Sequence, residues 1–328
     1  MRKKIIILAS ALTVLSGIVA IVLYLVTLSI PKELVEYGAS DKWGADSHAH
    51  LAAYMTSDQG FDAYAFMKLK SEITSAYTTD SIETDKVIYS ASSEIPLSLE
   101  AANTGTSASC TATVYLEDFF KFHFIPLKEG AYPTDSDTFT NAILIDENAA
   151  WRLFGTGSGA VGMEVLIGDE YYTVCGITEP LSGVYTDTYG DKPRVYLRAD
   201  SGYMWTEKTS FTTLDVMLPD PITNYAVNIL SEKTNSYNGA VRSIDDRFFG
   251  KELDKIRSGT TALITDSSDT EYPFFEKAML ILSLKAADVY AAMKVMIYIA
   301  LFGVFVMFCT LYGPTVRAIG RLFKKFKF

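Results

Sequence analysis

The sequence predicts an α+β extracytoplasmic domain between two transmembrane helices. Two long uncharged runs, one near each end of the chain, predict the membrane helices. Between them, segments with apolar residues at alternate positions are interspersed with segments whose apolar residues recur every three or four positions. The first spacing is typical of strands and the second of helices, so the outer region contains both.

The two uncharged runs are long enough to cross a bilayer, for which about 20 apolar residues suffice. Ile5–Ile30 has 26 residues and Val295–Tyr312 has 18. The first run is longer than the apolar part of a cleaved signal peptide, about 7–15 residues, and no small-residue cleavage site follows it, so we interpret it as an uncleaved anchor. We assign residues 1–30 and 287–312 to the membrane helices.

Basic residues flank both runs on the sides that face the chain ends. They are Arg2, Lys3 and Lys4 before the first run and Arg317, Arg321, Lys324, Lys325 and Lys327 after the second. Because Lys and Arg beside spans stay cytoplasmic, we expect a two-pass protein of the cell membrane with both termini inside and residues 31–286 outside. Without these eight residues, 21 basic residues remain against 39 acids, a balance of about −18. That charge does not suit nucleic acid or anionic lipid as a partner, so we expect no nucleic acid partner, and it suits a solvated outer domain.

The outer region begins with a strand–helix–strand–strand pattern. Residues 47–55 alternate weakly, residues 86–99 are rich in Val, Ile and Tyr, and residues 106–116 alternate strongly, so all three predict strands. Residues 61–77 place their apolar side chains on one helix face.

The pattern recurs near the end of the outer region. Residues 211–218 predict a strand, Pro221 is suited to be the first residue of a helix, and residues 241–249 predict a returning strand. The apolar face of this helix comprises Ile222, Ala226, Ile229 and Leu230.

Two strand–helix–strand units on one antiparallel sheet form a ferredoxin-like sandwich. We therefore expect a ferredoxin-like lobe at about residues 45–116 and 206–250. Residues 117–205 are expected to form an inserted strand–helix–hairpin lobe.

The inserted lobe has its clearest pattern at residues 141–155, NAILIDENAAWRLFG. Residues 142–145 predict a buried strand, and Asp146 is suited to cap the following helix by accepting backbone N–H bonds. Gly155 is placed to close the helix in the left-handed conformation. The residues expected to pack inward are Ala149, Ala150, Leu153 and Phe154.

A hairpin pattern follows this helix. Met163, Val165 and Ile167 alternate, Gly168-Asp169 fits a two-residue turn, and residues 172–174 continue on the return strand.

Residues 274–312 contain no proline and no glycine before Gly303, so they predict one helix that continues into the second span. Its 39 residues would measure roughly 58 Å, about half of it above the bilayer. Such a helix is suited either to pass movement between the outer domain and the membrane or to serve as an ordinary stalk.

The order NAILIDENAAWRLFG, VGMEVLIGDEYYTVCGI and RVYL resembles the MacB-type periplasmic core domain, the outer part of FtsX-like ABC permeases. The matches are Leu153-Phe154-Gly155, Gly162, Gly168 and Val174-Cys175-Gly176-Ile177. The resemblance covers residues 1–312 and is most specific at 141–177.

The resemblance implies a non-catalytic membrane component whose outer domain transmits movement or recognises a ligand or partner. It implies an ABC ATPase and a fuller permease subunit as partners, in a homo- or hetero-oligomer. The family usually has four spans, whereas two are present here, so we expect a shortened member. The alternative is a free-standing two-span envelope sensor or adhesion protein that keeps the same outer domain.

The basic tail, residues 313–328, occupies the place where the family's cytoplasmic segment lies near the ATPase. Its lysines and phenylalanines also suit an anchor on anionic membrane lipids, and we favour that interpretation.

Several motifs suggest chemistry that their context does not support. Gly157–Gly162 matches GxGxxG, but a helix precedes it and a strand follows, the reverse of a dinucleotide site. His48 and His50 lie on one strand face but lack a third metal ligand nearby, so we interpret them as a polar strand edge. Residues 119–124, FFKFHF, are interpreted as core packing rather than as a binding patch.

Neither the acids nor the cysteines define a catalytic site. The acidic pairs Asp135/Asp137, Asp187/Asp191 and Asp266/Asp269 are interpreted as solvated loops. Cys110 and Cys175 are either bridged or two buried single thiols, and we favour the thiols. No HExxH, GxSxG or Walker A sequence occurs, so we expect no enzyme activity, no cofactor and no metal site.

Overall fold

The computed structural model describes residues 2–43, 48–84, 86–133, 141–190, 192–202, 209–248, 250–258 and 272–325. The chain divides into two compact units. The smaller unit comprises residues 1–32, 248–261 and 282–328, and the larger comprises residues 33–247 and 262–281.

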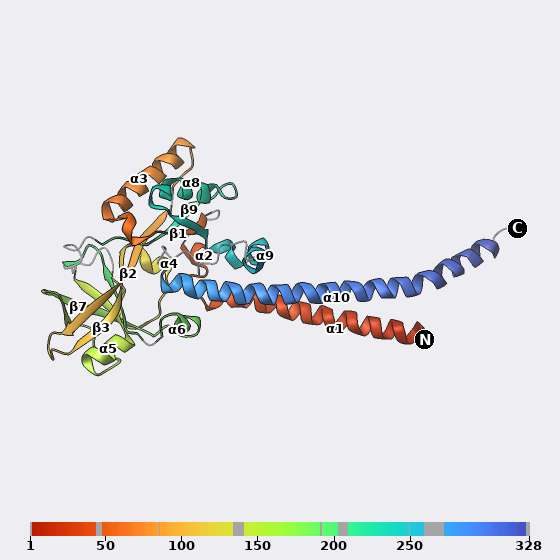
Figure 1. Cartoon of the computed structure of the whole chain (residues 1–328), viewed down its shortest axis with the longest axis horizontal. Helices are drawn as coiled ribbons and strands as arrows, with labels where there is room; N and C mark the ends of the chain where they lie inside the picture. The colour runs from red at the N-terminus through yellow and green to blue at the C-terminus, as the bar shows by residue number, and fades with distance from the viewer. Residues whose placement is uncertain are drawn as a thin grey trace. The chain divides into compact units, whose positions relative to one another are not determined.

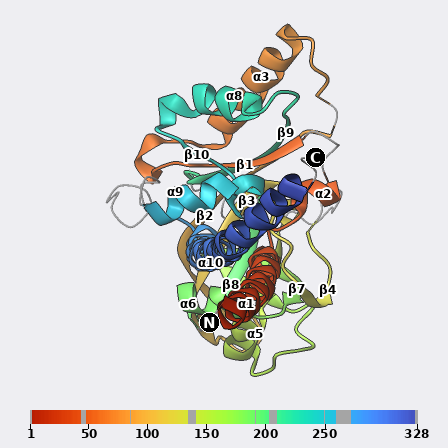
Figure 2. The ribbon, with the colours of Figure 1, turned by 90° about the vertical axis from the view of Figure 1, so that its right-hand side faces the viewer.

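The smaller unit contains the first candidate membrane helix and most of the second, from Leu282 onward. Helix α1 (Arg2–Ser29) and helix α10 (Phe274–Lys325) are long and apolar enough to cross a membrane, over Lys3–Glu33 and Phe274–Tyr312, so the structure contains two candidate membrane helices. The bounds 1–30 and 287–312 stay a prediction. The two helices lie side by side (Figure 1, Figure 2). Helix α10 begins where predicted but has 52 residues, so it continues beyond Tyr312. The short helix α9 (Gly250–Ser258) also belongs to this unit.

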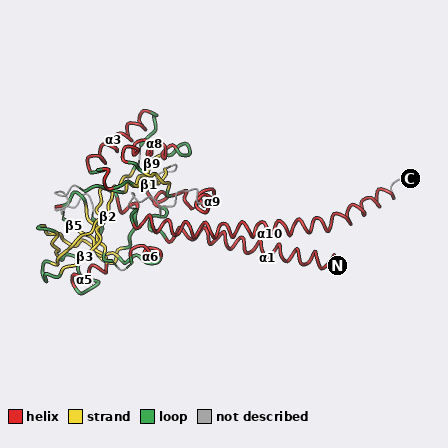
Figure 3. Tube along the Cα trace, in the orientation of Figure 1, coloured by secondary structure: helices red, strands yellow, loops and turns green. Residues whose placement is uncertain are grey.

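The described residues of the larger unit form a mixed sheet of ten strands, drawn in yellow in Figure 3. Their order is β10-β1-β9-β2-β3-β8-β5-β7-β4, and β6 pairs with β2 and β7. The strands are β1 (His48–Tyr54), β2 (Ile88–Ala101), β3 (Ser107–Glu117), β4 (Leu127–Gly130), β5 (Ala142–Asp146), β6 (Glu164–Ile167), β7 (Glu170–Thr178), β8 (Arg194–Arg198), β9 (Thr213–Pro219) and β10 (Ala240–Ser243). The helices of this unit are α2 (Ala39–Trp43), η2 (Ser57–Gln59), α3 (Ala63–Thr79), α4 (Phe119–Phe122), α5 (Glu147–Phe154), α6 (Val184–Tyr189), α8 (Tyr225–Thr234) and η3 (Asn235–Tyr237). The 3-10 helices η1 (Ile30–Glu33) and η4 (Asp245–Phe248) lie where the chain passes between the two units.

The order β10-β1-β9-β2, antiparallel throughout, is the ferredoxin-like arrangement that the sequence predicts. Helices α3 and α8 lie together on one side of these strands (Figure 2). The first strand–helix–strand motif of this lobe is β1–α3–β2 and the second motif is β9–α8–β10.

Two details of the second strand–helix–strand motif, β9–α8–β10, differ from the prediction. Pro221 is not the first helical residue: α8 begins at Tyr225, after Asn224, whose φ of 69° turns the chain. Ile222 therefore lies outside the helix and is 72% exposed, whereas Ala226 and Leu230 are buried as expected. The returning strand β10 has only four residues, and the 3-10 helix η4 follows it.

The second lobe is joined to the first through the paired strands β2 and β3. Strand β3 pairs with β2 over eleven positions and, on its other side, runs parallel to β8. Strand β5 lies between β8 and β7, and β6–β7 is the hairpin. Helix α5 packs on this part of the sheet, next to β3. The lobe boundaries at residues 116/117 and 205/206 stay a prediction.

Candidate functional site

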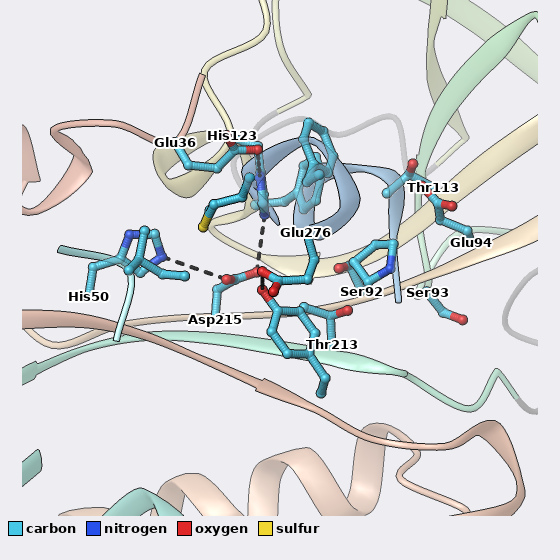
Figure 4. A pocket seen from close by; sticks show the side chains of 16 residues that line it. Glu36, His50, Ser92, Ser93, Glu94, Thr113, His123, Thr213, Asp215 and Glu276 are labelled. Carbon is cyan, nitrogen blue, oxygen red and sulfur yellow. Dashed lines mark hydrogen bonds and ion pairs between the residues drawn. The ribbon is translucent and has the colours of Figure 1, made fainter. Parts of the chain in front are cut away.

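The functional candidate in the larger unit is a buried cluster of charged side chains around the first turn of α10. Its central member is His123, which directly follows α4 and is 5% exposed. His123 Nδ1 lies 3.2 Å from Glu36 Oε1, and His123 Nε2 lies 3.1 Å from Asp215 Oδ2 (Figure 4). Both carboxylates are buried, Glu36 near the start of the outer region and Asp215 on β9. A doubly protonated imidazole fits this position because it donates from both nitrogens.

The charges of this group stabilise one another. Burial opposes the charged form of His123, but the charge of Asp215 and hydrogen bonds to Asp215 and Glu36 raise the pKa of His123 to about 9. Burial also opposes the charge of Asp215, but His123 and the nearby His50 lower the pKa of Asp215 to about 2. His50 Nε2 lies 3.6 Å from Asp215 Oδ1. At neutral pH the cluster therefore contains a cationic His123 between two carboxylates.

A second ion pair involves α10 itself. Glu276, in the first turn of α10, is fully buried. Arg247 Nη1 donates to both of its carboxylate oxygens, at 2.7 and 2.8 Å. The Tyr54 hydroxyl on β1 donates to Glu276 Oε2 at 2.7 Å, and burial together with the charge of Glu276 raises the pKa of Tyr54 well above its usual value. The carboxylate is thus neutralised and hydrogen-bonded, as a buried charge requires.

Aromatic rings connect α10 with the first group. The Phe275 ring stacks on His123 at a centroid distance of 4.3 Å, and Phe119 lies on the same imidazole at 4.5 Å. Phe274 lies beneath the guanidinium of Arg194, 3.5 Å from its Cζ. Tyr185 donates to Glu36 at 2.8 Å. The first turn of α10 is therefore held by ionic and aromatic contacts at once.

The space enclosed by these side chains is about 10 Å³ and is lined by members of both ion-pair groups, among them Glu36, His50, His123, Asp215 and Glu276. That volume accommodates about one water molecule, whereas ligand pockets measure about 300–1,000 Å³. The described residues contain no group of three His, Cys, Asp or Glu side chains that could hold a metal ion. The geometry suits a fixed structural junction rather than a substrate site.

One of the two predicted strand histidines is placed differently from the prediction. Strand β1 pairs with β9 from His48 to Tyr54 but with β10 only from Leu51 to Tyr54, and His48 is partly exposed. His50 is 1% exposed and faces Asp215, together with the distant His123. Sequence reasoning missed this convergence, although His123 stands out as a polar residue within the aromatic run FFKFHF.

The helix of the middle lobe has the following local geometry. Asp146 is the N-cap of α5, and its side chain accepts from the Ala149 N–H at 2.6 Å. Burial raises the pKa of Asp146 to about 6 against the opposing backbone hydrogen bonds. Gly155 ends the helix with φ 71°. Leu153 is 1% exposed, while Phe154 is only partly buried against the core.

The glycines of the hairpin have conformational roles. Gly168 has φ 59° at the first position of the two-residue β6–β7 turn, as in a type II′ turn. Gly162 has φ 85° and precedes β6. Gly176 lies so close to Leu144 that an added Cβ would overlap the leucine side chain, at 2.8 Å.

The other motifs lie as follows. The 157–162 loop lies between α5 and β6, and an added Cβ at Gly157 would overlap the Trp151 indole. Phe119 and Phe122 are core residues, whereas Phe124 is half exposed. The three cysteines are free thiols: Cys110 is buried, Cys175 partly buried and Cys309 exposed.

Some predicted residues fall outside the described part of the chain. These are Asp135, Asp137, Asp191, Asp266, Asp269 and Lys327. The side chains of Arg317, Arg321, Lys324 and Lys325 are likewise outside it, although α10 continues through these positions.

Comparison with known proteins defines the class. The model of the MacB-like periplasmic core domain matches residues 8–232, and the chain therefore belongs to this family. The chain contains an outer domain of the ABC transporter permease type together with two candidate membrane helices. The family match confirms the resemblance that the sequence motifs predict. Members of the family work with ABC ATPases.

Solved structures of similar fold include two transporter domains. One is the extracellular domain of the noncanonic ABC-type transporter YknZ from Gram-positive bacteria, at 16% identity and a TM-score of 0.40, covering 60% of this chain and 99% of that one. The other is the periplasmic region of MacB from Actinobacillus actinomycetemcomitans, at 13% identity and a TM-score of 0.40, covering 60% of this chain and 88% of that one. A comparison with curated protein sequences finds no significant match.

Proposed function

We propose that this chain is a non-catalytic component of an ABC transporter, whose outer domain passes movement to the membrane through α10. One observation carries the proposal: the helix whose first turn belongs to the buried charge cluster also contains the second candidate span, without interruption. The outer domain is also where a ligand or protein partner would be recognised.

The energetics of the cluster support rigid attachment. Separating Arg247 from Glu276 would leave an unpaired charge in the protein interior, which costs about 3–5 kcal/mol. Sliding Phe275 from His123 would remove a stacking contact as well. The start of α10 therefore moves with the sheet of the outer domain instead of independently of it.

The proposed topology has both termini in the cytoplasm and residues 31–286 outside, because the basic flanks of both spans lie toward the chain ends. The tail residues Arg317, Arg321, Lys324, Lys325 and Lys327 would then lie at the anionic inner membrane surface. The proposed partners are an ABC ATPase and a fuller permease subunit.

The first experiment is gentle detergent extraction of the tagged native chain, followed by mass spectrometry of the proteins that accompany it. An ABC ATPase and a permease in fixed ratio support the proposal. Recovery of the chain alone contradicts it and favours a free-standing envelope sensor or adhesion protein.

The second experiment tests transmission through α10 in the reconstituted complex. Asp288 is exposed on α10 between the cluster and the uncharged run, and proline at this position kinks a helix interior. A fluorophore at Thr79→Cys on α3 should report an ATP-dependent change in the wild type and in Asp288→Ala. Asp288→Pro should keep the ATPase bound but lose that change, and an undiminished signal in this variant would refute transmission through the helix.

A further inference from the structure

The short helix α9 (Gly250–Ser258) has a distinctive position in the smaller unit. Its sequence, GKELDKIRS, is amphipathic: Leu253 and Ile256 are buried, whereas Lys251, Lys255 and Arg257 are exposed. Both carboxylate oxygens of Asp254 contact Lys294 Nζ on α10, at 2.6 and 2.5 Å. This ion pair fixes the level of α9 along α10.

Lys294 lies at the membrane boundary of α10. It is the last charged residue before the uncharged run Val295–Tyr312. The Tyr290 ring contacts its Nζ at 4.8 Å, and Tyr298, one turn into the run, is 68% exposed. Tyrosine is enriched at the headgroup level of a bilayer, and a lysine side chain near the end of a span extends to that level.

The packing of α10 against α1 shows which part of α1 lies at the level of Lys294. Gly303 faces Ala9 and Thr13 of α1 so closely that an added Cβ would overlap Thr13 Oγ1. The two helices run in opposite directions (Figure 1). Lys294 lies nine residues before Gly303, about 13 Å along α10 at 1.5 Å per residue. Lys294 is therefore level with about residue 20 of α1. Tyr24, which is 50% exposed, lies one turn further out. Tyrosines on both helices therefore mark the headgroup level at which α9 is attached.

The charges of α9 are only partly neutralised within the protein. Asp254 is paired with Lys294, and Glu252 is paired with Lys255. The side chains of Lys251 and Arg257 are exposed and make no ion pair or hydrogen bond with any residue that the structure describes. They are six residues apart, about 9 Å along the helix axis. Two such cations at headgroup level match the charge of lipid phosphates.

We propose that α9 is a lipid-binding helix, in which Lys251 and Arg257 bind the phosphates of anionic phospholipid in the leaflet nearest the outer domain. The acidic outer region is repelled by such lipids, so α9 provides local positive charge where the chain leaves the membrane. The proposal is independent of any transporter partner, because it rests only on contacts within the smaller unit.

The test uses the purified full chain in detergent, with phosphatidylglycerol or phosphatidylcholine added and the retained lipid counted by native mass spectrometry. The wild type should retain phosphatidylglycerol in preference to phosphatidylcholine. Lys251→Gln/Arg257→Gln should retain at least threefold less phosphatidylglycerol at an unchanged melting temperature. The control Lys68→Gln/Lys86→Gln removes the same charge from exposed positions of the larger unit and should behave as wild type.

Equal phosphatidylglycerol retention by the wild type and the α9 variant would overturn the proposal, and so would an equal loss in the control. A depth measurement gives a second readout. A fluorophore at Lys255→Cys, with Cys175 and Cys309 replaced by serine, should be quenched by headgroup-labelled lipid in nanodiscs. Quenching by aqueous iodide alone would place α9 away from the bilayer and refute the binding site.

Discussion

The ion pair between Arg247 and Glu276 offers the sharpest test of how α10 is held. We consider Arg247→Met, which keeps an apolar stem of similar length but removes the charge. Glu276 is fully buried and would keep only the hydrogen bond from Tyr54. Loss of one member of a buried pair costs about 3–5 kcal/mol, because the other charge remains without compensation.

The double variant Arg247→Met/Glu276→Met distinguishes a charge effect from a packing effect. It leaves no unpaired charge, and the remaining penalty is the unsatisfied Tyr54 hydroxyl, about 1–3 kcal/mol. The double variant should therefore be more stable than Arg247→Met alone. A packing effect predicts the opposite, since two altered side chains would cost more than one.

The assay is thermal unfolding of the full chain in detergent, followed by a thiol-reactive dye that reports exposure of the buried Cys110. Cys175 and Cys309 are replaced by serine in every variant, so that only one thiol reacts. For a unit of this size, 1 kcal/mol shifts the melting temperature by about 2–4 °C, so Arg247→Met should melt about 6–20 °C below wild type. Lys68→Met, which removes a charge from an exposed helix position, should melt close to wild type. A single variant within about 2 °C of wild type, or a double variant less stable than the single one, would refute the reasoning.

Three further predictions concern the middle lobe, the charge of His123 and the packing of α1 against α10. Leu153→Ala, at a position 1% exposed, should lower the free energy of unfolding by about 2–5 kcal/mol, whereas Trp151→Ala, 56% exposed on the same helix, should have a much smaller effect in the same urea titration. The pKa of His123 is raised to about 9, so the stability that its charge contributes is complete below about pH 6.5 and disappears as the pH rises through 9. Over this pH range the free energy of unfolding of the wild type should fall by about 3 kcal/mol, and that of His123→Gln should not. Parallel pH profiles of the two proteins would contradict this prediction. Gly303→Leu should separate the two spans and lower the melting temperature, but Gly17→Leu should not, because an added Cβ meets nothing within 4 Å there; equal melting of both variants would argue against close packing at Gly303.

Much of the fold follows from local sequence patterns. The apolar spacing of residues 61–77 and the alternation of residues 106–116 are properties of neighbouring residues, and each corresponds to an observed element, α3 and β3. The recurrence of strand–helix–strand predicts the order of four strands because the ferredoxin-like arrangement leaves few alternatives.

The start of α8 could not be predicted in the same way. Pro221 is a favourable first residue of a helix, but Asn224 adopts a left-handed conformation and delays the helix to Tyr225. Asparagine tolerates this conformation better than most residues. A single backbone angle therefore overrides the local preference of the proline.

The charge cluster could not be predicted because its members are far apart in the sequence. Glu36, His123, Asp215 and Glu276 come from four segments that only the completed sheet brings together. Two of them do leave a local signal. His123 in FFKFHF and Glu276 in FFEKAML are polar residues beside aromatic pairs, where burial requires a distant partner.

The position of β9 between β1 and β2 has a consequence for biosynthesis. Strands β1 and β2 do not pair with each other, and the strand that joins them begins at Thr213, 112 positions after β2 ends at Ala101. At about 5–20 residues per second, the ribosome needs roughly 6 to 20 seconds to deliver that strand. During this interval both strands have open edges, which are sites of wrong pairing and aggregation. A newly made chain therefore carries two unpaired strand edges until β9 arrives.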